Sequence, residues 1–154
     1  MEINGLPLHP LAVHGAVVLA PLVALLALAY LRPSWRDRLR WPLVAGAAIA
    51  VGAVVLAFVS GNHFRNANAF FVSPKSAITD RVDHHHNLAR ITLWVALAFG
   101  AVALLNALLH ERLGGAARML LGVLLAAGAI GVIVMVVLTG DAGARAVWGT
   151  NFKG

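Results

Sequence analysis

Histidines occur in this chain at places where a hydrophobic sequence tolerates few polar groups. His9 and His14 lie at the start of the first long apolar run, and His84, His85 and His86 lie just before the third. A polar side chain next to hydrocarbon needs a hydrogen-bonding partner or a function. Imidazole is an axial ligand of haem iron and also binds Cu and Zn. We therefore expect these histidines to hold b-type haem or a metal ion.

The spacing within each histidine group limits which side chains can share one site. His9 and His14 are five residues apart, and on a helix this separates them by about 140° of rotation, so only one of them can face the interior of a bundle. Three consecutive helical residues also point in three directions. We predict that the two axial ligands are His14 on the first helix and His86, or else His85, on the third.

Charged residues near these histidines could serve either the cofactor or an alternative metal site. Arg90 lies one turn beyond His86, and Arg145 follows the last apolar run. Each is expected to pair with a haem propionate. Asp141 is expected to pair with one of these arginines or else to bind a metal. If the site takes Zn or Cu instead of haem, its ligands are expected among His9, His14, His63, His84, His85, His86 and Asp141.

The composition is that of a membrane protein. Of the 154 residues, 60% are hydrophobic and only 12% are charged, whereas soluble domains carry about 25% charged residues. The net charge of +6 comes mostly from short loops, which indicates membrane topology and contact with anionic lipid and not with nucleic acid. The chain has no cysteine. This excludes disulfides, thiolate metal sites, cysteine-ligated iron–sulfur clusters and covalent c-type haem.

Four apolar runs are long enough to cross a bilayer, which takes about 20 helical residues. None alternates with the period of two that is expected of a barrel strand. We therefore predict an all-α membrane protein, a single domain over residues 1–154, with four transmembrane helices at about residues 10–31, 41–60, 88–109 and 117–139. The last helix is expected to end at Gly140, and residues 142–148 are expected to fold back over the end of the bundle.

Two basic loops indicate how the bundle lies in the membrane. Residues 32–40 join the first helix to the second, and residues 110–118 join the third to the fourth. Because short loops rich in Arg and Lys stay in the cytoplasm, both are predicted to face it. Both termini, residues 61–83 and the histidines named above then lie on the extracytoplasmic side of the cell (inner) membrane, whereas His110 lies on the other side.

Two longer motifs carry a family resemblance. One runs from Gly5 to His14 (GLPLHPLAVH), and the other from Thr139 to Trp148 (TGDAGARAVW). With four helices and a histidine at the third, this pattern resembles the bacterial DUF2231 family of membrane proteins over nearly the whole chain. The resemblance implies a redox association, because the domain also occurs fused to Rieske-type or cytochrome modules. The family motif often has histidine where this chain has Asp141, which argues against a ligand role for that position.

The leading functional prediction is a small membrane protein that binds haem b and transfers electrons, with a quinone or a redox protein as partner. One alternative is a membrane protein that binds Zn or Cu. Another is a non-catalytic accessory subunit of a larger complex, such as a respiratory complex, in which the histidines only form hydrogen bonds. The sequence contains no hydrolase triad, P-loop or dinucleotide-binding motif, so we do not expect an enzyme that works alone. A homo-oligomer is also compatible with the sequence.

Overall fold

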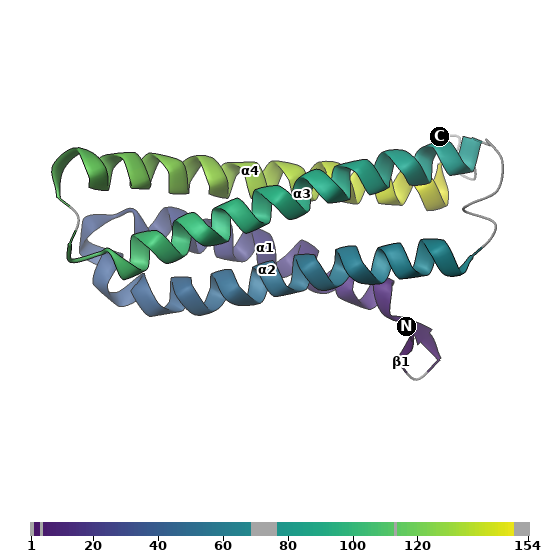
Figure 1. Ribbon diagram of the computed structural model, residues 1–154, viewed down its shortest axis with the longest axis horizontal. Helices are drawn as coiled ribbons and strands as arrows, with labels where there is room; N and C mark the ends of the chain where they lie inside the picture. Colours follow the sequence, from purple (N-terminus) through teal and green to yellow (C-terminus); the bar gives the residue numbers. More distant parts are fainter. Residues whose placement is uncertain (1, 4, 69–76, 113, 150–154) are drawn as a thin grey trace.

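The described part of the protein is an antiparallel bundle of long helices (Figure 1). The structure is a computed structural model, and it describes residues 2–3, 5–68, 77–112 and 114–149. Within these residues four long helices follow one another up and down: α1 (Leu8–Tyr30), α2 (Arg36–Ala67), α3 (Ala77–Leu108) and α4 (Gly115–Trp148). All four are long and apolar enough to cross a membrane. The prediction of an all-α bundle of four membrane-spanning helices is therefore confirmed.

The two ends of the bundle differ in chemistry. At one end lie both chain termini, the starts of α1 and α3 and the ends of α2 and α4 (Figure 1). We call it the terminal end. At the other, the arginine end, the chain turns from α1 into α2 through the short helix η1 (Pro33–Trp35) and from α3 into α4. Which end faces the cytoplasm stays a prediction from the basic loops.

Three helices are longer than the sequence predicted. At the terminal end α2 continues to Ala67, α3 begins at Ala77 and α4 continues to Trp148. The predicted helix end at Gly140 and the fold-back of residues 142–148 are therefore wrong. Hydropathy marks only the part of a helix that matches the hydrocarbon layer, whereas backbone hydrogen bonds can extend the helix beyond it. Much of the predicted segment 61–83 is accordingly helical, and its residues 69–76 lie outside the described residues.

The start of α1 places His9 in the first helical turn. Before it, strands β1 (Glu2–Ile3) and β2 (Leu6–Pro7) pair antiparallel, and Gly5 between them has the positive φ of 78° that glycine adopts without strain. The helix begins at Leu8, two residues before the predicted start. Pro10 fits within the first turn because the backbone N–H groups there have no partner inside the helix.

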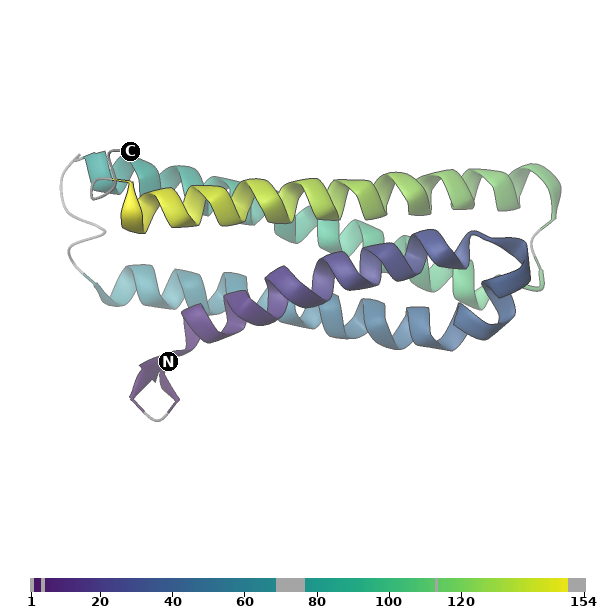
Figure 2. The same cartoon turned by 180° about the vertical axis from the view of Figure 1, so that it is seen from behind.

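The bundle consists of two helical hairpins. α1 packs most extensively on α2, and α3 on α4, whereas the contacts of α2 with α3 and of α1 with α4 are less extensive (Figure 2). α1 and α3 therefore lie diagonally across the bundle. Much of the core is alanine, with a few larger side chains such as Phe99 and Leu43. Small side chains let membrane helices approach closely where no hydrophobic force drives them together.

A polar network joins three helices at the arginine end, and the sequence reasoning did not anticipate it. The Tyr30 hydroxyl donates to the Asn106 carbonyl oxygen at 3.1 Å and lies 3.1 Å from His110 Nδ1. His110 Nε2 lies 2.6 Å from a carboxylate oxygen of Asp37. Arg40 Nε on α2 donates to a carbonyl of α3 at 2.8 Å. This network ties the two hairpins together at the end opposite the other histidines.

Candidate functional site

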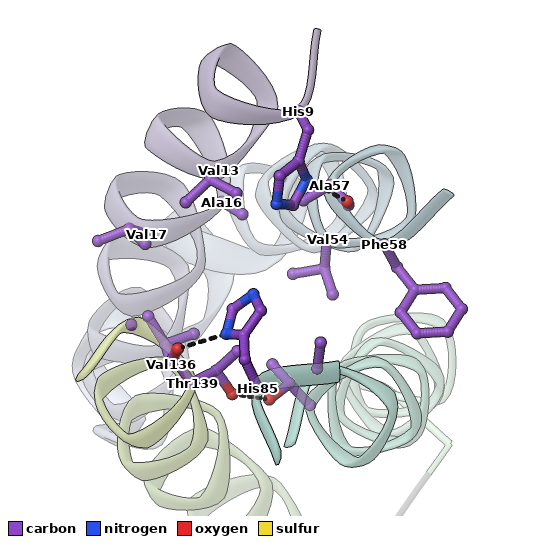
Figure 3. Close-up of a pocket in the computed structure, with 13 residues that line it drawn as sticks. His9, Val13, Ala16, Val17, Val54, Ala57, Phe58, His85, Val136 and Thr139 are labelled. Carbon is purple, nitrogen blue, oxygen red and sulfur yellow. Dashed lines mark hydrogen bonds between the residues drawn. The ribbon is translucent and has the colours of Figure 1, made fainter. Parts of the chain in front are cut away.

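A cavity of about 80 Å³ lies between the four helices near the terminal end. Figure 3 shows the residues around it, which come from both hairpins. Most of them are alanine, valine or glycine, and the polar members are two histidines and two threonines. The lining residues are His9, Val13, Ala16, Val17, Val54, Ala57, Phe58, His85, Ala89, Thr92, Val136, Thr139 and Gly140.

His9 is held by the other helix of its own hairpin. Its Nδ1 lies 3.0 Å from the Ala57 carbonyl oxygen on α2. Because a carbonyl can only accept, Nδ1 carries the proton, and in the neutral ring Nε2 keeps its lone pair. The ring also stacks on Phe64, with the centroids 6.3 Å apart. At Gly61 a Cβ atom would come within 2.8 Å of His9 Cε1, so the absence of a side chain there lets the ring lie against α2.

His85 is held in the same way within the second hairpin. Its Nδ1 donates to the Thr139 carbonyl oxygen on α4 at 3.0 Å. Beside this bond the hydroxyl oxygens of Thr92 and Thr139 are 2.7 Å apart, which links α3 to α4 a second time. Gly143 makes room for the ring, because a Cβ atom there would lie 3.0 Å from His85 Cε1. His85 Nε2 is therefore also left with a lone pair when the ring is neutral.

The two imidazole rings meet across the cavity. Their centroids are 6.5 Å apart and their planes make an angle of 66°. Figure 3 shows the rings pointing toward one another from opposite sides of the cavity, with the nitrogen that is not hydrogen-bonded to the backbone directed into the space between them. A carbonyl that fixes the tautomer of each ring, with its other nitrogen free, is typical of histidines that bind a metal.

The structure brings together one member of each predicted histidine group. His14 is exposed, its Nδ1 lies 2.6 Å from the Pro10 carbonyl oxygen of its own helix, and it does not line the cavity. His86 stacks on Phe58, with the centroids 5.7 Å apart, and does not line the cavity either. The two histidines that face the cavity are thus His9 and His85. His85 is the predicted alternative to His86, whereas His14 does not line the cavity.

The predicted charged residues occupy the surface of the bundle. Arg145 Nε donates to Asp141 at 2.8 Å, one turn apart on α4, so the expected ion pair between these two residues is confirmed. Arg90 is exposed, and its guanidinium donates to the Asn87 side chain at 3.4 Å. The expected pairing of Arg90 and Arg145 with propionates stays a prediction.

The alternative metal site is not assembled within the described residues. No three His, Asp or Glu side chains there come together as a group that could hold a metal ion. His63 and His84 are exposed and do not line the cavity. Of the set proposed from sequence, His9 and His85 meet at the cavity, whereas the remaining members do not line it: His14, His63, His84, His86 and Asp141.

Four membrane-spanning helices with two histidines facing a common internal cavity define a multi-pass membrane protein with a candidate ligand site inside the bundle. The family model described as "Predicted membrane protein (DUF2231)" matches residues 5–153, and the chain belongs to this family. The resemblance seen in the two end motifs is thereby confirmed. No curated protein and no solved structure matches the chain.

Proposed function

We propose that this membrane protein binds b-type haem between His9 and His85 and takes part in electron transfer. The observation that supports the proposal is the pair of imidazoles whose Nδ1 atoms donate to backbone carbonyls, so that each Nε2 is free to bind iron. Each ring is oriented by its own hairpin, and the two hairpins present them to one another. A haem needs only two protein ligands, because the porphyrin supplies the other four.

The distance between the rings suits one metal centre. Imidazole nitrogen binds a first-row metal at about 2.0 Å, and a ring centroid lies about 1.2 Å behind its Nε2, so two rings on opposite sides of one ion have centroids about 6 Å apart. The observed separation is 6.5 Å. Both imidazoles would therefore be able to reach one metal ion held between them.

The donor atoms fit haem, whereas the cavity of about 80 Å³ is smaller than a porphyrin. Haem binding would therefore require the two hairpins to move apart where α1 packs on α4 or where α2 packs on α3. The contacts between the hairpins, α1 with α4 and α2 with α3, are less extensive than the contacts within each hairpin. They lie on either side of the line that joins His9 on α1 to His85 on α3. The small side chains Ala16, Ala57 and Ala89 border this region.

The residues of the chain would have three tasks in such a site. His9 and His85 would bind the iron, and the carbonyls that hold their Nδ1 protons would keep both rings oriented and raise their basicity. The apolar lining would exclude water, and a low dielectric around the site would set the reduction potential. When bound, haem would supply one-electron oxidation and reduction, with a redox protein or a quinone as the proposed partner.

The test is a dithionite-reduced minus oxidised visible spectrum of the protein purified from cells supplied with haem. We expect a b-type alpha band and about one haem per chain. His9→Ala and His85→Ala should each lose the spectrum of two-histidine coordination. His14→Ala is the matched control on the same helix and should leave the spectrum unchanged. Haem content that falls in His14→Ala and persists in His9→Ala would contradict the assignment of ligands.

A bare metal ion is the second candidate, because it would need little more room than the cavity now offers. Two imidazoles can hold copper, which imidazole suits, without a third protein ligand. This candidate predicts a protein without a haem spectrum after haem-supplemented expression, with about one copper per chain that is lost in His9→Ala. A protein with neither haem nor metal would favour the third prediction, an accessory subunit in which the two histidines serve only to bind their carbonyls.

A further inference from the structure

A second hollow lies on the outside of the second hairpin, at the terminal end. Its volume is about 480 Å³, within the range of about 300–1,000 Å³ that is usual for small-molecule sites. It shares no residue with the histidine cavity. We call it the α3–α4 groove, and it is lined by Asp80, Arg81, His84, Leu88, Leu138, Asp141, Ala142 and Arg145.

The lining of the groove changes from apolar to charged along the helices. Leu88 and Leu138 lie nearest the middle of the bundle, because they are farthest from the start of α3 and the end of α4. Asp80 and Arg81 are in the first turns of α3, and Arg145 is in the last turn of α4. In a membrane the groove would therefore present charges at the headgroup level and leucines to the acyl chains below.

The charges in the groove are not all satisfied within the protein. Arg145 and Asp141 neutralise one another at 2.8 Å. Among the described residues, however, neither Arg81 nor Asp80 makes an ion pair, and the Nη1 atom of Arg81 is buried without a hydrogen-bond partner. A buried donor without a partner is costly and usually indicates a missing ion, water or ligand. Within the described residues, the groove thus contains an arginine with one buried, unsatisfied donor and an exposed aspartate outside any ion pair.

We propose that the α3–α4 groove binds a phospholipid whose headgroup carries both a phosphate and an ammonium group. The phosphate would take hydrogen bonds from Arg81 and His84, and the ammonium group would lie at Asp80. One acyl chain would follow Leu88 and Leu138 toward the membrane interior. The two arginines and two aspartates of the groove cancel in formal charge, so a headgroup without net charge matches it better than an anionic one.

The test is lipid retention, measured by native mass spectrometry of the whole protein transferred from detergent. The probes are phosphatidylethanolamine, phosphatidylcholine and phosphatidylglycerol, each offered separately at the same concentration. We expect phosphatidylethanolamine to be retained at about one molecule per chain and in preference to the other two. Arg81→Gln should weaken its retention about tenfold, the effect of losing one charge-assisted hydrogen bond. Arg112→Gln, an exposed arginine at the other end, is the matched control and should retain it fully.

A second variant and a competition with inorganic phosphate test the proposal independently of Arg81→Gln. Leu138→Trp narrows the path of the acyl chain and should also reduce retention, so that the proposal does not depend on Arg81→Gln being stable. Equal retention of all three lipids, or unchanged retention in both variants, would overturn it and indicate ordinary annular lipid. If inorganic phosphate alone displaced the lipid at equal concentration, the ligand would be free phosphate and the lipid assignment would be wrong.

Discussion

Replacing Gly61 by alanine tests whether the position of the His9 ring depends on this glycine. A Cβ atom at residue 61 would lie 2.8 Å from Cε1 and 3.0 Å from Nδ1 of His9, whereas carbon atoms in unstrained contact are about 3.5–4.0 Å apart. The ring must therefore retreat by roughly 0.7 Å or more. Such a movement lengthens and breaks the bond of 3.0 Å between Nδ1 and the Ala57 carbonyl.

The expected cost follows from these contacts. A lost hydrogen bond costs about 0.5–1.5 kcal/mol, and forcing an extra methyl group into a packed contact costs about 1–3 kcal/mol. Alanine offsets up to about 1 kcal/mol of this through its higher helix propensity. We expect Gly61→Ala to destabilise the protein by about 1–2 kcal/mol. Gly52→Ala is the control on the same helix, because no described atom lies within 4 Å of its added Cβ, and it should be neutral or slightly stabilising.

A double-mutant cycle with His9→Ala isolates the contact. When the ring is absent, the methyl group at residue 61 meets nothing that must move, so Gly61→Ala should change from destabilising to neutral or stabilising. The assay is unfolding in mixed micelles of dodecyl maltoside and dodecyl sulfate, followed by circular dichroism. If Gly61→Ala costs the same free energy with and without the His9 ring, the proposed contact is refuted.

Two further predictions use the same unfolding assay. Tyr30→Phe removes both contacts of the buried hydroxyl, with the Asn106 carbonyl and with His110. It should lower the free energy of unfolding by about 1–2 kcal/mol. A change below the error of the assay would show that the network at the arginine end adds no stability. Asp141→Asn breaks only the exposed pair with Arg145 and should cost less than about 0.5 kcal/mol, so a larger loss would indicate a second partner for Asp141.

The number and order of the membrane spans follow from the sequence because hydrophobic runs are a direct signature of spanning helices. The positions where the helices stop at the terminal end, however, do not follow from the sequence. Residues such as His63 and Asp83 are polar, so hydropathy assigns them to a loop, yet both lie inside helices that continue beyond the hydrophobic run. Gly140 likewise looks like a helix end from its type alone, whereas α4 continues for two further turns.

The sequence predicts a histidine site at the terminal end of the bundle, and the cavity there is lined by His85, the stated alternative to His86, and by His9 but not by His14. His14 lies deeper in the apolar run than His9, but depth does not determine which face of a helix is buried. The buried face of α1 contains Ala12, Ala16 and Ala20, and His9 continues this stripe at helical spacing. His85 stands in the same relation to the buried residues of α3. The spacing of such stripes in the sequence predicts which face of each helix is buried.

Other features of the site depend on distant parts of the chain and could not be predicted from local pattern. The carbonyls that fix the two rings belong to Ala57 and Thr139. Ala57 follows His9 by 48 residues, and Thr139 follows His85 by 54 residues. The diagonal placement of α1 and α3 is likewise a property of how the hairpins associate. A single sequence contains no periodicity that specifies either of these relations.

During synthesis the α1–α2 hairpin leaves the ribosome before the α3–α4 hairpin does, because it comes first in the chain. Membrane helices insert first and associate afterwards, so this hairpin can enter the bilayer with His9 already bonded to its own partner helix at Ala57. The α3–α4 hairpin inserts later, and in it His85 bonds to its own partner helix at the Thr139 carbonyl. The two imidazoles meet only when the halves close on one another. A ligand that binds both rings would therefore hold the two hairpins together. It would be present only on molecules in which both hairpins have associated.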